Sequence, residues 1–140
     1  MTQNPNTILE EHSICYLEMA FRNDRHGILK NADGHGKKTG ECGDTIEMFL
    51  SVENSIIENI FFQVEGCLNT NACSNAVAEL AQGKTIEEAW NIITPEAISG
   101  YLESLPPDHI HCAELAAGAF YLALTDYQNI KQNPWKKAYR

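Results

Sequence analysis

Hydrophobic and polar residues alternate along two adjacent stretches in the middle of the chain. Residues 45–52 (TIEMFLSV) place Ile, Met, Leu and Val on one face, and residues 56–64 (IIENIFFQV) are rich in Ile, Phe and Val. The three residues between them, 53–55, are suited to a short turn. The pattern predicts a β-hairpin with one buried face. Because a lone hairpin is marginally stable, it needs helices or a third strand beside it.

The part of the chain before the hairpin predicts one helix and a loop. Residues 8–22 carry apolar side chains at helical spacing, which indicates a short helix in an N-terminal arm of residues 1–22. Residues 23–43 contain five glycines, and this density is typical of a loop. We expect that loop to enclose a short edge strand, which would be the third strand of the sheet.

The part after the hairpin predicts four helices. Asn69 or Thr70 caps the first, which stops at Gly83. Thr85 starts the second, with Glu88 completing a capping box. The last two open at Thr94-Pro95 and near Ile110, and they end at residues 105–107 and at about Tyr127.

This order, with the hairpin first and the helices after it, predicts an α+β fold. We expect a small antiparallel sheet with the helices packed on one face. A chain of 140 residues fits one domain, so residues 1–140 are interpreted as a single unit. Residues 128–140 are predicted to be a flexible tail.

Composition and charge narrow the classes of partner. The chain is 44% hydrophobic, but no apolar run approaches the roughly 20 residues that a membrane span requires. The polar N-terminus lacks the basic start and apolar stretch of a secretory signal, so we expect a cytoplasmic protein without a membrane partner. The net charge of −9 would repel a phosphate backbone, which argues against nucleic acid.

The cysteines provide the first sign of chemistry. An odd number of cysteines without an export signal argues against a disulfide framework. The absence of a C-x-x-C pair argues against a zinc ribbon or a thioredoxin-type site. Cys15 and Cys73 lie within predicted helices, where packing is the expected role. The five cysteines are Cys15, Cys42, Cys67, Cys73 and Cys112.

Three short segments each place a cysteine at the edge of a predicted element. They are residues 40–44 (GECGD), 65–67 (EGC) and 109–112 (HIHC). Because the start of one hairpin strand lies beside the end of the other, Cys42 and Cys67 are expected at the same end of the sheet. Spacing alone does not place Cys112 beside them.

The surrounding residue types favour a metal or a metal cluster. Cys67 and Cys112 are predicted near helix N-termini, where the helix dipole lowers a thiol pKa and favours the thiolate that binds soft metals. Asp44 and His111 add a hard and a borderline ligand. Gly43 and Gly66 are expected to leave room for a bulky inorganic group. Three further histidines, His26, His35 and His109, are predicted to be solvated.

Several of these segments together resemble the IscU/NifU-type iron–sulfur scaffold family, from about Arg22 to Tyr127. No single match is specific, but their order and spacing are. The matching stretches are residues 31–34 (NADG), 42–44 (CGD), 66–67 (GC), 83–89 (GKTIEEA), 105–107 (LPP) and 110–112 (IHC).

The resemblance implies that the chain is a scaffold and not an enzyme. On it a transient 2Fe-2S cluster would be built from iron and sulfur and transferred to apo acceptor proteins. The implied site is Cys42, Cys67 and Cys112, with Asp44 labilising the cluster and His111 as a further ligand. The implied sulfur donor is a cysteine desulfurase, with Cys112 receiving the persulfide. Zinc in the purified form is also expected.

The segment before the last site cysteine departs from the family pattern. Many members have Leu-Pro-Pro-Val-Lys there, which a dedicated Hsp70-type chaperone recognises. This chain has Leu105-Pro106-Pro107 followed by Asp108 and His109. The resemblance therefore implies a chaperone partner whose recognition motif is altered here.

Two alternatives remain beside the scaffold. The first is a zinc-dependent sulfurtransferase that accepts sulfur from a cysteine desulfurase, with Asp44, Cys67 and Cys112 on zinc and Cys42 exchanging sulfur. The second is a cysteine hydrolase with a Cys112–histidine pair. It is disfavoured because adjacent residues such as His111 and Cys112 rarely present their side chains to each other.

Overall fold

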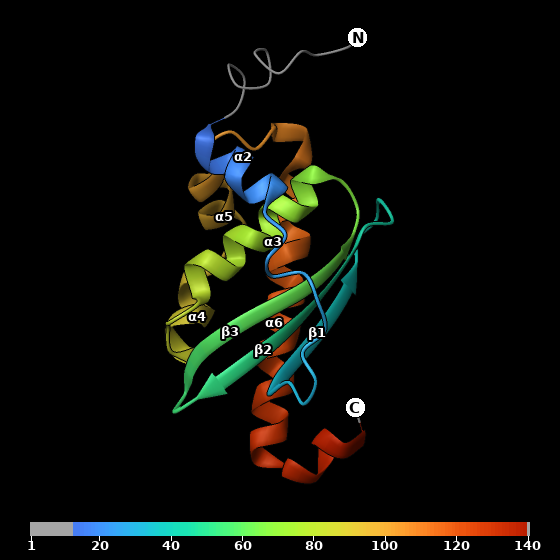
Figure 1. The fold of residues 1–140 in the computed structure, drawn as a ribbon, viewed down its shortest axis with the longest axis vertical. Coiled ribbons are helices and arrows are strands. Elements are labelled where there is room, and N and C mark those ends of the chain that lie inside the picture. Colours follow the sequence, from blue (N-terminus) through green and yellow to red (C-terminus); the bar gives the residue numbers. More distant parts are fainter. Residues whose placement is uncertain (1–12, 140) are drawn as a thin grey trace.

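The computed structural model describes residues 13–139 and contains one small sheet with helices against it (Figure 1). The fold is α+β, as predicted. Residues 8–12 of the predicted N-terminal helix lie outside the described residues. In chain order the elements are α2 (Ile14–Phe21), β1 (Gly34–Thr39), β2 (Thr45–Glu53), β3 (Ile56–Glu65), α3 (Leu68–Ala81), α4 (Ile86–Ile92), α5 (Pro95–Leu102), η1 (Pro107–His109), α6 (Ile110–Gln132) and η2 (Pro134–Tyr139).

The three strands form an antiparallel sheet in the order β1-β2-β3, which confirms the hairpin and the third strand. The hairpin turn is tight, since Glu53 pairs with Ile56. Asn54 and Ser55 between them both have positive φ, at 53° and 64°. This conformation matches the twist of the two flanking strands.

A register shift explains why the second hairpin strand alternates imperfectly. Ser51 pairs with Asn59, but Val52 pairs with Ile57, so Glu58 is an extra residue in β3. An extra residue of this kind reverses the side-chain alternation beyond it. Ile57 and Ile60 therefore both reach the core, although they are three residues apart.

Strand β1 packs against helix α6 so closely that two of its glycines face the helix backbone directly. A Cβ atom on Gly34 would lie 2.5 Å from the carbonyl oxygen of Ala123, and one on Gly36 would lie 2.4 Å from the Ala123 nitrogen. Real Cβ atoms do not approach this closely, so both positions require glycine. The loop glycines before the hairpin are thus partly packing residues.

The core lies between the sheet and the helices behind it. It joins Met48 and Phe62 of the sheet to Val77 of α3 and Phe120 of α6, all of which are fully buried. Thr85 and Glu88 form the predicted capping box of α4, and Thr94 caps α5.

The ends of two helices differ from the prediction. Helix α3 begins at Leu68 with Cys67 as its N-cap, rather than at Asn69 or Thr70, and Cys67 provides no side-chain capping bond. Helix α6 continues to Gln132, and residues 134–139 form η2 where a tail is predicted. An ion pair of 3.3 Å between Lys137 and Asp33 ties this segment to the body of the domain.

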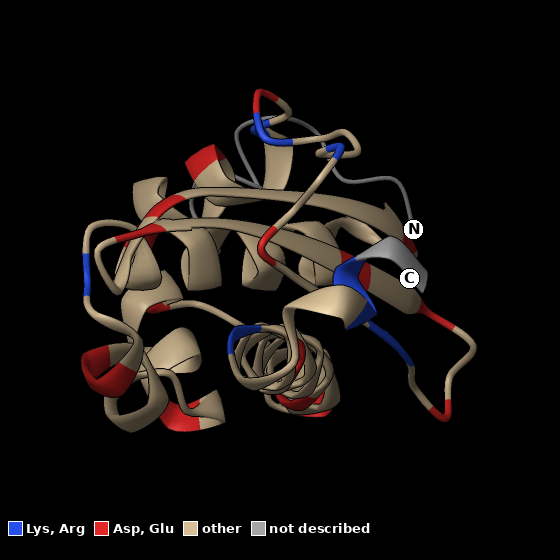
Figure 2. Ribbon diagram, turned by 90° about the horizontal axis from the view of Figure 1, so that it is seen from below, with Lys and Arg blue, Asp and Glu red and all other residues tan. Residues whose placement is uncertain are grey.

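Charged residues are spread over elements on several sides of the molecule (Figure 2). The acidic excess of the sequence therefore does not form a single stripe. Among the helices that the structure describes, none is both long and apolar enough to cross a membrane.

Candidate functional site

The three segments that contain the candidate residues meet at one end of the sheet. Thr45 pairs with Glu65, so the loop before β2 and the turn after β3 lie side by side. This pairing places Cys42 and Cys67 at the same end, as the hairpin predicts. A backbone bond of 2.8 Å from the Gly40 N–H to the Asp44 carbonyl closes the loop.

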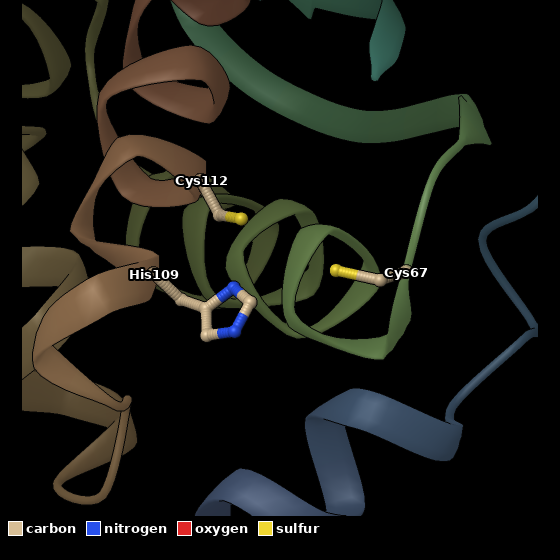
Figure 3. A group of neighbouring side chains, drawn as sticks. All are labelled: Cys67, His109 and Cys112. Carbon is tan, nitrogen blue, oxygen red and sulfur yellow. The ribbon is translucent and has the colours of Figure 1, made fainter. Parts of the chain in front are cut away.

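Cys112 joins Cys67 at this end, together with a residue that the sequence analysis did not select. The ligand atoms of Cys67, His109 and Cys112 all lie within 4.8 Å of one another. Figure 3 shows both sulfur atoms and the imidazole ring turned toward a common space. The three residues come from the N-cap of α3, the end of η1 and the first turn of α6. We call this group the inner site.

Thr70 connects the inner site to Asp44. Its hydroxyl donates a hydrogen bond of 2.6 Å to Asp44 Oδ2, and it lies 3.6 Å from Cys67 Sγ and 3.7 Å from Cys112 Sγ. The side chain is fully buried in the first turn of α3. The sequence pattern indicates only a helix cap at Thr70, so its place at the site was not predicted.

Gly66 allows the Asp44 carboxylate to reach Thr70. A Cβ atom at this position would lie 2.7 Å from Asp44 Oδ2 and 3.0 Å from Thr70 Oγ1. The space that Gly66 leaves is therefore filled by the chain's own carboxylate. Gly43 has no atom within 4 Å of a Cβ position, but its φ of +90° favours glycine.

The Cys67 thiol has a lowered pKa, as its place at a helix N-terminus predicts. Burial alone would raise this pKa, but hydrogen bonds from Thr70 and from the Asn69 backbone and side chain, in the first turn of α3, outweigh it. These donors stabilise the thiolate. Cys67 is also exposed, so it combines access with an acidic thiol.

The same expectation for Cys112 is wrong. Its side chain is fully buried, and burial raises the pKa of the thiol to about 11. The Thr70 hydroxyl lowers this pKa, but the nearby Cys67 and Asp44 raise it further. Cys73 is also buried, with a raised pKa, which agrees with its predicted packing role. A metal ion could still bind Cys112 by displacing the thiol proton.

Cys42 and His111 lie on the outer side of the site. Both line an open pocket of about 630 Å³ together with Lys38 and Glu114. Both side chains are exposed, and neither belongs to the inner site. The His111 ring lies 5.7 Å from the His109 ring, centroid to centroid. We call this the outer pocket; it adjoins the inner site through the two histidines.

His109 is predicted to be solvated, but only 34% of its side chain is exposed. Its Nδ1 atom is buried and has no hydrogen-bond partner among the described residues. The sequence contained a signal for this position, because His109, His111 and Cys112 occur within four residues. The resemblance to the scaffold family implied the ligand role for His111 instead.

The donor set suits a soft or borderline metal. Two thiols, an imidazole and a carboxylate match the ligands that zinc and iron use in proteins. All five cysteines are free, including those outside the site.

Known proteins resemble this chain in both sequence and fold. The model of the NifU-like N terminal domain matches residues 17–134. The iron–sulfur cluster assembly scaffold protein IscU 1 of Archaeoglobus fulgidus is 41% identical over 109 residues, which cover 76% of this chain and 71% of that protein. The scaffold protein IscU of Aquifex aeolicus is 36% identical over 111 residues, which cover 76% and 70%.

A solved structure shows the same fold at lower identity. The nitrogen-fixing NifU-like protein (N-terminal) from Brucella abortus has a TM-score of 0.68 and 18% identity, over 87% of this chain and 97% of that one. The family model spans the sheet, helix α3 with Cys67 at its start, and all of α6 with Cys112 in its first turn. The chain therefore belongs to the IscU/NifU-type family that the NifU-like N terminal domain defines.

Proposed function

We propose that this chain is a scaffold on which an iron–sulfur cluster is assembled and from which it is passed on. The observation that carries the proposal is that Cys67 and Cys112 meet and are linked through Thr70 to Asp44, at the end of the sheet that also carries the exposed Cys42. Sulfur ligands at the ends of three separate elements suit a large inorganic cargo. Relatives at 41% and 36% identity are named as scaffolds of this kind.

The mixture of ligands favours temporary binding of the cluster. Electron carriers commonly hold a cluster with four thiolates. The proposed ligands here are Cys42, Cys67 and Cys112, with Asp44 and His111 in supporting roles. A site with three thiolates, open on the Cys42 side, holds a cluster less firmly and lets an acceptor approach.

The finer details of this function are also proposals. The cargo is a 2Fe-2S cluster, and the sulfur comes from a cysteine desulfurase as a persulfide accepted at Cys112. The cluster then moves to apo acceptor proteins, and the chain catalyses no reaction of its own. A chaperone partner would meet Asp108 and His109 beside the Leu-Pro-Pro segment. The expectation of a cytoplasmic location remains a prediction.

Anaerobic reconstitution with ferrous iron and sulfide tests the function. The wild-type protein should develop the visible absorption of an iron–sulfur cluster and lose it to an apo ferredoxin. The variants Cys42→Ala, Cys67→Ala and Cys112→Ala should each take up less cluster. Cys15→Ala is the matched control, because Cys15 lies in α2 and bonds the Tyr101 carbonyl instead. Unchanged uptake in all three site variants would end the scaffold proposal.

One observation keeps the zinc-dependent sulfurtransferase as a second candidate. Cys42 is exposed and lies outside the inner site, where it could exchange sulfur while Asp44, Cys67 and Cys112 hold zinc. The two functions differ in what zinc does. Stimulation of a cysteine desulfurase by the zinc-loaded protein, without any cluster forming, would favour the sulfurtransferase.

A further inference from the structure

The outer edge of strand β3 is covered at two points and open between them. β3 is an edge strand, because the sheet has the order β1-β2-β3. Near its start, Ile57 exchanges two backbone hydrogen bonds, of 2.8 and 2.9 Å, with residues 83–84. Toward its end, Phe62 exchanges two bonds of 3.0 Å with residues 25–27. Residues 58–61 of the strand lie between these two crossings.

Ile60 directs its backbone N–H and C=O groups out of this open edge. Opposite residues in an antiparallel pair alternate between bonded and non-bonded pairs. Because both backbone groups of Phe62 bond outward, its pair with Met48 is non-bonded, and so is the pair of Ile60 with Leu50 two residues away. Among the described residues, no hydrogen bond reaches Ile60 from the outer side. An edge of this kind is a template for pairing with an extended chain.

A groove follows the open edge. Two cavities, of about 770 and 180 Å³, together border β3 from Ile56 to Phe61. Arg25, Asn59 and Gln82 line both cavities, so we treat the two as one and call it the β3 groove. The larger cavity alone has the size of sites that bind small ligands, about 300–1,000 Å³.

Arg25 supplies an unused donor at this groove. Its side chain is only 10% exposed. Nη2 donates to Glu79 Oε1 at 3.0 Å and to Gln82 Oε1 at 3.1 Å, but Nη1 is buried and has no hydrogen-bond partner among the residues described. A buried donor without an acceptor costs free energy, and a carboxylate is the acceptor that best matches a guanidinium.

We propose that the β3 groove binds the carboxyl-terminal end of an extended segment of a partner protein. Its last residues pair with the backbone of Ile60, and its terminal carboxylate accepts from Arg25 Nη1. A chain end fits because the two crossings leave only a few residues of β3 for pairing. Gln82 is exposed, so its side chain can move aside for the carboxylate.

The charges in the groove set the direction of the bound segment. Glu53 raises the pKa of Glu58, so two carboxyl groups lie close together near the Ile57 crossing. They would repel a carboxylate there, which leaves the Arg25 end for the terminus. The groove is also remote from the inner site, because the 14 residues of α3, about 20 Å, separate Cys67 from Gln82. The inference therefore does not depend on the proposed function.

Selection from a library of random hexapeptides with free carboxyl termini provides the test. Peptides enriched on the wild-type chain are synthesised with a fluorescent label, and their binding is measured by anisotropy. Amidation of the carboxylate should weaken binding by about 10-fold or more, as loss of a charge-assisted hydrogen bond does. If no peptide is enriched, or if amidation changes nothing, the proposal is wrong and Arg25 Nη1 bonds only water.

A pair of variants assigns the binding to the groove. Asn59 and Gln63 are exposed on the same face of β3, but only Asn59 lines the groove. Asn59→Asp adds a negative charge at constant size and should weaken binding by about 5-fold, the size of an exposed charge contact. Gln63→Glu is the matched control and should change the affinity by less than about 2-fold. Equal effects of the two substitutions would overturn the assignment.

Hydrogen exchange tests the backbone pairing without any variant. The Ile60 N–H has no acceptor among the described residues, so a saturating peptide should slow its exchange by about 10-fold or more. The Phe62 N–H already bonds the Arg25 carbonyl and should change little. Unchanged exchange at Ile60 beside a bound peptide would show that the peptide binds elsewhere, which contradicts the proposal.

Discussion

At the scale of single residues, one hydroxyl group organises the site. Thr70 is buried, donates to Asp44, and lies within 3.7 Å of both inner sulfurs. Thr70→Val keeps the shape of the side chain but removes the donor. We expect a loss of about 1.5–3 kcal/mol in the free energy of unfolding, as for hydrogen bonds to charged groups, measured by urea denaturation. Thr70→Ser should recover most of this loss, and equal stability of all three proteins would contradict the assigned bond.

The cysteines should differ in their reactivity. Cys67 combines exposure with a lowered pKa, so its thiolate fraction rises at lower pH than that of an ordinary thiol. Cys112 is buried with a pKa of about 11 and stays protonated at neutral pH. Brief alkylation of the metal-free protein at pH 7–8, read by peptide mass spectrometry, should modify Cys67 well before Cys112. Raising the pH should bring the alkylation rates of the two cysteines closer together. Modification of Cys112 before Cys67 would contradict the assigned order of their pKa values.

Some of the site residues could be predicted from the sequence, and others depend on burial and on side-chain direction. The hairpin places Cys42 at the same end of the sheet as Cys67, because antiparallel pairing brings the start of β2 beside the end of β3. The raised pKa of Cys112 was missed because helix position indicates the dipole but not the burial that outweighs it. His109 was missed because only the fold shows which of two nearby histidines points inward.

At the scale of elements, the contact between β1 and α6 depends on missing side chains. A methyl group on Gly36 would lie 2.4 Å from the Ala123 nitrogen and 2.5 Å from the Ala119 carbonyl oxygen. Gly36→Ala should therefore destabilise the protein by about 1–3 kcal/mol, as overpacking does, because backbone and not a movable side chain is in the way. Thermal unfolding of Gly36→Ala and of the wild type would measure this loss of stability.

A second glycine provides the matched control. Gly100 lies in α5 with nothing within 4 Å of a Cβ position and without a positive φ. Gly100→Ala should stabilise the protein by about 0.5–1 kcal/mol, because alanine favours the helix. Similar effects from both substitutions would contradict the described packing of β1.

The elements themselves were largely predictable, and the misses have local causes. The N-terminal caps of α4 and α5 follow recognisable sequence patterns, which are Thr85 with Glu88 and Thr94-Pro95. The start of α3 was misplaced because Cys67, a poor side-chain cap, takes the N-cap position. The length of α6 was underestimated because residues 128–132 are mostly polar and show no hydrophobic periodicity. The helix propensity of these residues extends the helix there instead.

At the scale of the whole molecule, the inner site joins parts of the fold that are distant in sequence. An ion held there binds the folded chain and not the unfolded one, so it should stabilise the domain. Zinc at 100 times its dissociation constant should add about 2.7 kcal/mol to the free energy of unfolding. Zinc should therefore raise the Tm of the wild-type protein, and a chelator should reverse this increase. Zinc should not raise the Tm of Cys67→Ala; an increase in this variant would indicate that zinc binds elsewhere.

The close seam between β1 and α6 has a mechanical consequence for the cargo. Gly34, Gly36 and Gly40 follow α6 from Ala123 back to Leu115, less than one turn from Cys112. The loop with Cys42 and the first turn of the helix with Cys112 therefore lie along one tightly packed seam. Cys67 stands at the start of a different helix, α3, and the bond from Thr70 to Asp44 links that helix to the loop. An inorganic core carried between these sulfurs would thus bridge two packed units of the fold that a hydroxyl–carboxylate bond joins.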